Sequence, residues 1–380
     1  MKVLHVITSL NRGGAEIHLL NLVSEQVKNG HKVIVAYWKE DADLLKFFRK
    51  LNISTICLNK NKFFVENFIV INFFFCSLKL NKIIRSFNPE IIHAHLPFSE
   101  TICFVNLFFY KKAKFIISKH LDTVFFSRNN KRKSYLGKNL ERLISKKAKK
   151  IICISNAVKK FMSSSYMKLD LNKLETIYYG LDFKLYNDDK KNLKIIKFKK
   201  KLKGKKIIGT ISRLVPQKRL DDMINAFKTY NLKYEKNSRL IIVGKGPDKS
   251  KLKLLSSELG ISDKIIWIDY LSDIKGFFSL IDIFCLTSEH EGFGIVTLEA
   301  FYNKKPVICS NAGSLPEIVK NKFNGISIPK NKKNLFPLYF HFLMKKKNRY
   351  KIIVNAQKIL KKKFTNKEMY NKTNNIYKLN

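Results

Sequence analysis

The chain has 380 residues, about twice the length at which one hydrophobic core stops growing, so two domains are expected. Hydrophobic residues make up 45% and charged residues 27%, which allows a buried core and excludes a disordered chain. The formal net charge of +45, from 74 Lys and Arg against 29 Asp and Glu, predicts an anionic partner.

Neither a metal framework nor a membrane span is indicated. The six cysteines are widely spaced without a C-x-x-C pair, so neither zinc nor disulfides are expected. The apolar start, Met1–Leu10, is about half as long as a signal peptide and ends in Asn11-Arg12-Gly13-Gly14, which favours a first strand. The run Phe68–Leu78 is interrupted by Asn72 and is shorter than the ~20 residues that a transmembrane helix needs.

The first predicted strand leads into two glycines and then an amphipathic helix. Without Cβ atoms, Gly13 and Gly14 let a ligand approach the backbone, and the N–H groups of the helix terminus favour an anion such as a diphosphate. The alternative is a tight turn that requires positive φ, and a lone Gly-Gly does not separate the two interpretations.

Short β-branched runs alternate with segments of helical period, which is typical of parallel sheets covered on both faces. The first series of strands is expected at Lys2–Thr8, Lys32–Trp38, Ile91–Ala94, Lys114–Ser118 and Lys150–Ile154. The second series is expected at Ile207–Ser212, Arg239–Val243, Ile265–Trp267, Ile283–Leu286 and Pro306–Cys309. A polar, basic stretch separates them, so we predict domains over residues 1–185 and 205–362, joined by a linker over 186–204.

Two cations follow the strand Ile207–Ser212. Arg213 and Lys218 there could hold a diphosphate and neutralise it as it leaves, as magnesium does elsewhere. The alternative is a solvated pair, because basic residues are abundant in this chain.

The strongest local pattern runs from Ser288 to Ala300. A buried strand ends in a glycine-punctuated loop and a helix begins near Ile295, so residues 292–295 present backbone N–H groups at a helix N-terminus. Glu291 stays on the loop, and Glu299 lies about one turn into the helix. A carboxylate accepts two hydrogen bonds in one plane, which suits vicinal sugar hydroxyls. The alternatives are an exposed helix charge for Glu299 and a helix cap for Glu291.

With the spacing Glu291-x7-Glu299, the chain resembles the retaining GT-B glycosyltransferases of family 4. Supporting matches run in order along the chain, at Gly13–Glu16, His93–His95, Ile154-Ser155, Tyr179–Asp182, Gly209–Lys218, Val243–Pro247, Lys305–Val307 and Gly313–Glu317. The resemblance implies an α/β fold of two Rossmann-like, doubly wound parallel-sheet domains facing an interdomain cleft. It also implies acceptor binding mainly in the first domain, nucleotide-sugar binding in the second, and a final helix over 363–380 that returns to the first.

The resemblance also implies roles for individual residues. Glu291 would face the donor sugar, and His120 matches the first-domain histidine that contacts this sugar near the reacting carbon. His95 would lie on the acceptor side; the alternative for both histidines is a core or turn residue. Arg213 and Lys218 would bind the diphosphate and Glu299 the ribose. The donor-binding residues are then Gly14, Arg213, Lys218, Gly292, Phe293, Gly294, Ile295 and Glu299.

Two positions depart from the family pattern. Tyr179 stands where Asn is frequent, which puts the geometry of that turn in doubt. Arg219 replaces a common Gly after Lys218, which could alter access of the diphosphate.

The predicted activity is retaining transfer of a sugar from a nucleotide diphosphate to a glycan or lipid-linked glycan, in cell-surface polysaccharide, lipopolysaccharide or glycoconjugate synthesis. A UDP-sugar is preferred over a GDP-sugar as donor, and no metal ion is expected. Arg213 and Lys218 would stabilise the leaving diphosphate more in the transition state than in the ground state.

Three other functions compete with this prediction. A nucleic-acid-binding protein is disfavoured because the aromatics fall in apolar runs such as Phe73–Phe75. An inactive scaffold is disfavoured by the intact pairs Glu291/Glu299 and Arg213/Lys218. The third alternative function is that of a nucleotide-sugar epimerase or a phosphorylase on the same architecture.

The charge of +45 has two explanations, which are low-GC coding and attraction to an anionic membrane leaflet. The C-terminal region is basic and amphipathic, with Lys345–Lys347 and Lys361–Lys363 in a helical pattern. We therefore expect a cytoplasmic protein that associates peripherally with the inner face of the cytoplasmic membrane.

Overall fold

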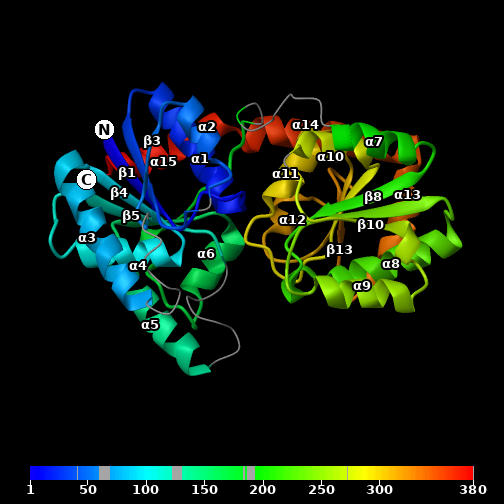
Figure 1. Ribbon diagram of the computed structural model, residues 1–380, viewed down its shortest axis with the longest axis horizontal. Coiled ribbons are helices and arrows are strands. Elements are labelled where there is room, and N and C mark those ends of the chain that lie inside the picture. The colour runs from blue at the N-terminus through cyan, green and yellow to red at the C-terminus, as the bar shows by residue number, and fades with distance from the viewer. Residues whose placement is uncertain are drawn as a thin grey trace. The chain divides into compact units, whose positions relative to one another are not determined.

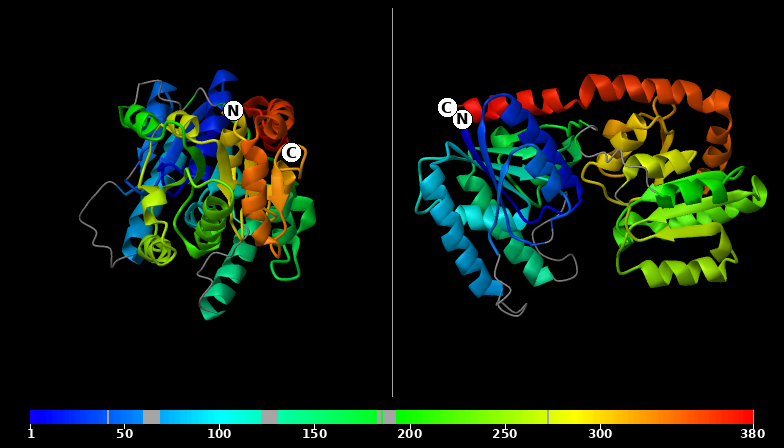
Figure 2. Two further views of the ribbon diagram at one scale, coloured as in Figure 1. Left: turned by 90° about the vertical axis from the view of Figure 1, so that its right-hand side faces the viewer. Right: turned by 45° about the horizontal axis from the view of Figure 1, so that its top comes forward.

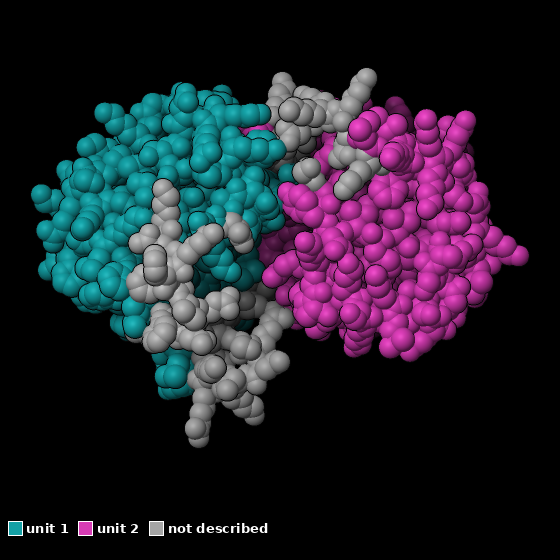
Figure 3. Space-filling model, in the orientation of Figure 1, with its two compact units in different colours: residues 1–182, 364–380 teal, residues 183–363 magenta. Residues whose placement is uncertain are grey.

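The computed structural model describes residues 1–40, 42–59, 69–121, 131–182, 185, 193–271 and 273–379. The chain divides into two compact units, coloured separately in Figure 3. Unit 1 comprises Met1–Asp182 and Phe364–Asn380, and unit 2 comprises Phe183–Lys363.

Unit 1 contains one parallel sheet with the strand order β3-β2-β1-β4-β5-β6-β7. Its strands are β1 (Lys2–Ile7), β2 (Lys32–Tyr37), β3 (Ser54–Cys57), β4 (Ile91–His95), β5 (Lys114–Lys119), β6 (Lys150–Cys153) and β7 (Leu174–Thr176). The five strands predicted for this half are confirmed. The strands at the two edges, β3 and β7, were not predicted, because they are short and only part of each is buried.

Helices cover both faces of this sheet, as Figure 1 shows. They are α1 (Gly14–Lys28), α2 (Leu45–Lys50), α3 (Ile69–Phe87), α4 (Pro97–Asn106), α5 (Lys131–Lys147), α6 (Asn156–Ser163), η1 (Leu171–Lys173) and α15 (Asn366–Lys378). Helices α3, α4 and α5 pack side by side on one face, and α1 packs with α15 on the other. Both ends of the chain therefore lie in unit 1, where Met1 packs against the cluster that holds Tyr377 (Figure 2).

Unit 2 contains a second parallel sheet, with the order β10-β9-β8-β11-β12-β13. Its strands are β8 (Lys206–Ile211), β9 (Ser238–Val243), β10 (Ile265–Ile268), β11 (Ile283–Leu286), β12 (Val307–Ser310) and β13 (Ile326–Ile328). Its helices are α7 (Leu193–Lys201), η2 (Pro216–Lys218), α8 (Leu220–Lys233), α9 (Lys249–Glu258), η3 (Ser262–Lys264), α10 (Ile274–Leu280), α11 (Ile295–Tyr302), α12 (Leu315–Ile318), η4 (Lys333–Leu335), α13 (Phe336–Met344) and α14 (Lys346–Lys363). The five predicted strands are again confirmed, and β13 is additional. Two sheets of this kind confirm the α/β class.

The predicted linker, 186–204, needs correction. Residues 193–201 form helix α7, which packs against α10 within unit 2. The polar and basic composition concealed an apolar side, on which Ile195 is buried. Residues 186–192 of the predicted linker lie outside the described residues.

The apolar run Phe68–Leu78 belongs largely to α3, which continues to Phe87; Phe68 itself lies outside the described residues. None of the helices in the described part of the chain has the length and hydropathy to cross a membrane.

A tight backbone contact ties α15 to the body of unit 1. The Leu181 N–H donates to the Phe364 carbonyl over 3.0 Å, and Leu181 forms a parallel bridge with Thr365. A Cβ on Gly180 would lie 2.1 Å from the Thr365 carbonyl oxygen, so only glycine fits here. The Thr365 hydroxyl accepts from the Glu368 N–H and caps α15.

A buried ion cluster joins three elements of unit 1. Lys119, at the end of β5, donates to Glu100 of α4 over 2.5 Å and to Glu141 of α5 over 2.8 Å. Burial lowers the pKa of Lys119, but the two carboxylates outweigh it and raise this pKa. Burial raises the pKa of Glu100 to about 7. The Lys119 ammonium opposes this rise, but it is shared with Glu141, whose negative charge raises the pKa of Glu100 further.

Replacing Lys119 with methionine is expected to reduce the free energy of unfolding by about 3–5 kcal/mol, because it leaves two carboxylates buried without a cation. Denaturant unfolding measures the loss. Adding Glu100→Gln and Glu141→Gln should recover most of it. The control is Lys28→Met, which breaks an exposed pair with Glu25 and should cost less than about 1 kcal/mol. Equal effects of the two lysine substitutions would contradict the assignment.

Candidate functional site

The first part of the candidate site follows β8 in unit 2. Arg213 lies on the loop after this strand, and its side chain is exposed. The neighbouring Leu214 anchors the loop, since its N–H donates to the Lys245 carbonyl and its carbonyl accepts from the Asp248 N–H. Arg213 makes no ion pair with any carboxylate in the described part of the chain. Its guanidinium charge therefore remains available to a ligand.

Lys218, at the end of η2, meets Glu291 from the loop after β11. Its Nζ donates to Glu291 Oε2 over 2.6 Å, and the side chains are only 13% and 14% exposed. The two loops are joined further by backbone bonds, because the Glu289 N–H donates to the Gln217 carbonyl. Thr287 Oγ1 also donates to the Lys218 and Arg219 carbonyls. Lys218 is thus held in place and is not the solvated cation of the alternative interpretation.

The helix predicted near Ile295 is confirmed as α11, which begins at that residue. Gly294 precedes it with φ +80°, a conformation that favours glycine, and Gly292, Phe293 and Ile295 are buried around the turn. Glu299, one turn into α11, is 3% exposed, so it is not the exposed helix charge of the alternative. Nor does Glu291 cap α11, because Gly294 occupies the cap position.

One of the two departures from the family pattern, Arg219, has a local explanation. Arg219 has φ +48°, which explains why glycine is common there. Its guanidinium binds Asp221 over 3.0 Å and Asp222 over 3.2 Å, and the hydrogen bond with Asp221 raises its pKa. The side chain is therefore committed to the first turn of α8.

Gly13 and Gly14, which follow β1, do not need positive φ. Gly13 precedes α1 with φ −142° and ψ 172°, which is ordinary extended backbone, so the turn proposed as the alternative is wrong. Gly14 is the first residue of α1, and the N-cap residue, Gly13, has no side chain to cap this helix terminus. The role of Gly14 in anion binding remains a prediction.

The second part of the candidate site is a cluster of buried histidines in unit 1. His95, at the end of β4, lies beside His120, which follows β5, with His95 Nδ1 and His120 Nε2 3.2 Å apart. Two further histidines of the strands join them, since His5 Nδ1 is 3.0 Å from His95 Nε2 and the tilted rings of His93 and His95 have centroids 4.2 Å apart. Both predicted histidines are thus bonded to side chains rather than to backbone.

The hydrogen bonds form a chain with a defined direction. Gln26 Oε1, 2.8 Å from His5 Nε2, is an acceptor, so His5 donates to it. A neutral imidazole then accepts at its other nitrogen, so His95 Nε2 donates to His5 and His120 Nε2 donates to His95. His120 Nδ1 is left as an acceptor, and the Tyr179 hydroxyl donates to it over 2.5 Å.

Burial keeps the cluster neutral. It lowers the pKa of His5 to about 4 and that of His120 to about 3, where the Lys119 charge contributes. It lowers the pKa of His18, His93 and His95 well below the usual value.

Two residues of this region could not be identified from sequence patterns. Tyr179, noted only as a departure from the family, is buried and bonds to His120. His18, on α1, stacks on Tyr179 with ring centroids 4.5 Å apart, and neither of its buried nitrogens has a partner among the described residues. A single histidine in an amphipathic helical pattern does not indicate that its side chain lies beside Tyr179 and His120.

Three of the histidines have the donor set of a metal site. Ring nitrogens of His5, His93 and His95 lie within 4.8 Å of one another. Each nitrogen already has a hydrogen-bond partner, however: those of His93 bond to the Tyr377 hydroxyl and to Ser118 Oγ. A metal ion would have to break these bonds, so the arrangement fits a hydrogen-bonded cluster better than a metal centre.

Comparison with protein families divides the chain in the same way as the two sheets. Residues 12–185 match the model described as Glycosyltransferase Family 4, and residues 192–359 match that of Glycosyl transferases group 1.

Relatives and solved structures extend the similarity over the chain. The O-antigen biosynthesis glycosyltransferase WclY of Escherichia coli is 25% identical over 386 residues, which cover 99% of this chain and 98% of WclY. The uncharacterized glycosyltransferase MJ1607 of Methanocaldococcus jannaschii is 28% identical over 251 residues, but the match spans only 62% of that relative and 63% of this chain. The crystal structure of Anabaena Alr3699/HepE with UDP and glucose has the same fold, with a TM-score of 0.82 at 18% identity, over 99% of this chain and 98% of that one.

Proposed function

Because the chain belongs to the GT-B glycosyltransferases of group 1, we propose that it transfers a sugar, with retention of anomeric configuration, from a nucleotide diphosphate to a glycan or lipid-linked glycan. The pathway that this proposal favours is the synthesis of a cell-surface glycan such as O-antigen. Full-length similarity to WclY supports it.

The observation that carries the proposal is the arrangement of cations at the carboxyl edge of the second sheet. Arg213 has a charge that no described carboxylate neutralises, and Lys218 is held beside Glu291 at 2.6 Å. Ligands of open α/β sheets bind at this edge, and a diphosphate matches a guanidinium and an ammonium there. We assign Arg213 and Lys218 to the diphosphate and Glu299 to the ribose.

The chemistry follows from where charge develops. As the glycosidic bond to the diphosphate breaks, the leaving group gains negative charge. The ammonium of Lys218 therefore stabilises the transition state more than it stabilises the bound donor in the ground state. The backbone of residues 292–295, at the N-terminus of α11, adds the positive end of a helix dipole. Glu291 holds Lys218 in position and presents its carboxylate to the sugar.

Unit 1 would serve the acceptor, with His95 proposed from the family resemblance on the acceptor side and His120 proposed to contact the donor sugar near the reacting carbon. His18 joins them, because its two buried nitrogens lack a described partner and its ring lies 5.5 Å from that of His120. A sugar hydroxyl is the kind of group that would satisfy such a nitrogen.

The donor is tested directly by thermal shift across UDP-, GDP- and ADP-sugars, followed by transfer assays with the sugar that stabilises the protein. We expect a UDP-sugar to give the largest shift. Stabilisation by none of these nucleotide sugars would contradict the proposal.

Transfer is expected to survive EDTA, because Arg213 and Lys218 supply the positive charge that a divalent ion would otherwise provide. Initial rates with and without the chelator measure this. Complete loss that only manganese restores would contradict it.

We also propose peripheral association with an anionic membrane. Helix α3 supports this, because Ile71, Phe74 and Leu78 recur at helical spacing and are 42%, 59% and 46% exposed. Amphipathic surfaces of this kind insert at the headgroup boundary, and the net positive charge adds electrostatic attraction.

Replacing Phe74 with serine is expected to reduce flotation with phosphatidylglycerol vesicles, because it removes an exposed aromatic side chain from this surface. The control is Phe323→Ser in unit 2, where the side chain is 49% exposed. Binding of the unsubstituted protein should also fall steeply as salt rises, because the Debye length is ~8 Å at physiological salt. Equal binding to neutral vesicles would contradict the proposal, and low-GC coding would then be the explanation for the net positive charge.

A further inference from the structure

Unit 1 has a cavity of about 510 Å³ at the amino edge of its sheet. Lys114 begins β5, Lys149 directly precedes β6, and Lys173 directly precedes β7. His95 lies at the carboxyl end of β4, which is the opposite edge of the same parallel sheet. The cavity is therefore separate from the candidate acceptor residues.

Lysine dominates the lining of this cavity. Six of its ten residues are lysines, whereas Lys and Arg together supply 74 of the 380 residues in the chain. The six are Lys111, Lys114, Lys146, Lys147, Lys149 and Lys173. No arginine and no acidic residue lines the cavity, so its charge is of one sign.

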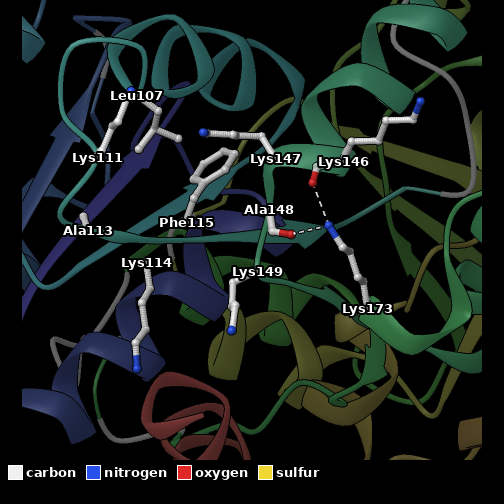
Figure 4. Close-up of a pocket in the computed structure, with 10 residues that line it drawn as sticks. All are labelled: Leu107, Lys111, Ala113, Lys114, Phe115, Lys146, Lys147, Ala148, Lys149 and Lys173. Atoms are coloured by element: carbon white, nitrogen blue, oxygen red, sulfur yellow. Dashed lines mark hydrogen bonds between the residues drawn. The ribbon is translucent and has the colours of Figure 1, made fainter. Parts of the chain in front are cut away.

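The positive charge is not neutralised within the described part of the chain. Lys173 donates to the Lys146 and Ala148 carbonyls over 2.6 and 2.9 Å, as the dashed lines in Figure 4 show. Lys114 likewise donates to the Leu379 carbonyl over 2.7 Å. Carbonyls orient an ammonium without cancelling its charge. None of the six lysines forms an ion pair with a described carboxylate.

The lysines surround an apolar centre. In Figure 4, Lys111 and Lys147 lie on one side of the Phe115 ring, and Lys114 and Lys149 lie on the other. Six lysines line this cavity without an acidic residue among them, and an anion with charge at both ends would offset positive charge on both sides of the ring.

We propose that this cavity binds a compact anion that carries two or more phosphate groups. Lysine is a point charge with three donors, which suits a tetrahedral phosphate, whereas planar carboxylates are matched better by the arginine fork. The one aromatic residue in the lining, Phe115, is 3% exposed, so no ring face is open for base stacking. This chemistry favours a polyphosphate or a lipid diphosphate headgroup over a nucleic acid.

The test uses inorganic tripolyphosphate and calorimetry on the full chain, with UDP in excess to occupy a donor site. The variant is Lys111→Gln/Lys147→Gln/Lys149→Gln, whose three side chains are exposed, so the fold should persist. The matched control is Lys361→Gln/Lys362→Gln/Lys363→Gln on α14 of unit 2, with the same change of charge and the same exposure. We expect about 100-fold weaker binding by the variant and unchanged binding by the control.

Flotation of the same proteins with phosphatidylcholine vesicles that contain a polyprenyl diphosphate identifies the source of the phosphates. Loss of flotation by the variant but not the control would assign the cavity to a lipid headgroup. Unchanged flotation with weakened tripolyphosphate binding would assign it to a soluble anion. Equal weakening in variant and control, or no weakening in either, would overturn the proposal. None of these measurements requires sugar transfer, so they stand apart from the proposed function.

Discussion

Replacing Lys218 with alanine is expected to lower kcat/KM for sugar transfer by about 10³, the size of effect that removal of a transition-state charge contact has in other enzymes. The substitution removes the ammonium proposed for the leaving diphosphate, and it also deprives Glu291 of its partner at 2.6 Å. Because both side chains are partly exposed, unit 2 should keep its fold. Steady-state kinetics and thermal unfolding of the same preparation separate the two effects.

The matched control for this prediction is Lys333→Ala. Lys333 Nζ pairs with Asp222 Oδ2 over 2.6 Å, also in unit 2, but it lies outside the proposed site. We expect its turnover to be near that of the unsubstituted protein. Near-normal turnover of Lys218→Ala at saturating donor would show that the site is assigned wrongly.

A substitution that preserves side-chain volume tests Glu299 better than alanine does. Its side chain is 3% exposed, so alanine would leave a cavity in unit 2. Glu299→Gln keeps the volume and removes the charge, which makes it the better test of ribose binding.

Acidification from pH 7 to pH 5 is expected to destabilise unit 1 by about 7 kcal/mol. The five buried histidines are neutral in the folded state, but they bind protons near pH 6.5 once unfolded. The unfolded state therefore binds more protons, and stability falls as the pH falls. Each histidine contributes about 2 kcal/mol over this interval.

Glu100 acts in the opposite direction. Its folded-state pKa of about 7 lies above the ordinary value of 4.5, so the folded state binds more protons between these values. Its contribution to stability is present at low pH and is lost as the pH rises to 7, which offsets about 2 kcal/mol of the histidine effect.

The two tryptophans allow each unit to be followed by itself. Trp38 lies on unit 1 and Trp267 on unit 2, so fluorescence of Trp267→Phe reports unit 1 and that of Trp38→Phe reports unit 2. We expect acid unfolding of unit 1 well before unit 2, which holds none of the five histidines. Coincident transitions, or a unit 1 signal that is stable at pH 5, would contradict the prediction.

Apolar patterns were sufficient to predict the central strands of both sheets. Strands such as Ile283–Leu286 are buried on both faces, so they read as continuous apolar runs. Edge strands such as β7 lack such runs, because one side of the strand has no neighbour in the sheet. The helix that starts at Ile295 was predictable because glycines mark its beginning.

Contacts between distant residues were not predictable from these patterns. The rule that parallel strands present ligands at their carboxyl ends placed Arg213, Lys218 and Glu291 at one edge. It did not reveal that Lys218 pairs with Glu291, 73 residues further along. The chain of hydrogen bonds from Gln26 to Tyr179 likewise depends on register between strands, which alternation within a single strand does not specify.

The closing contact between Gly180 and Thr365 has a consequence for the order in which the protein is made. Unit 2 is a continuous stretch of chain, so a ribosome releases all of it before α15 emerges. Unit 1 has its seven strands before unit 2, but the helix that covers α1 follows unit 2 in the chain. Its apolar surface includes Val3 and Leu22, which belong to the same buried cluster as Tyr377. This surface therefore stays exposed to water until α15 has been synthesised. The half of the protein that is synthesised first is thus the last to be finished, and during that interval it is the half most in need of a chaperone.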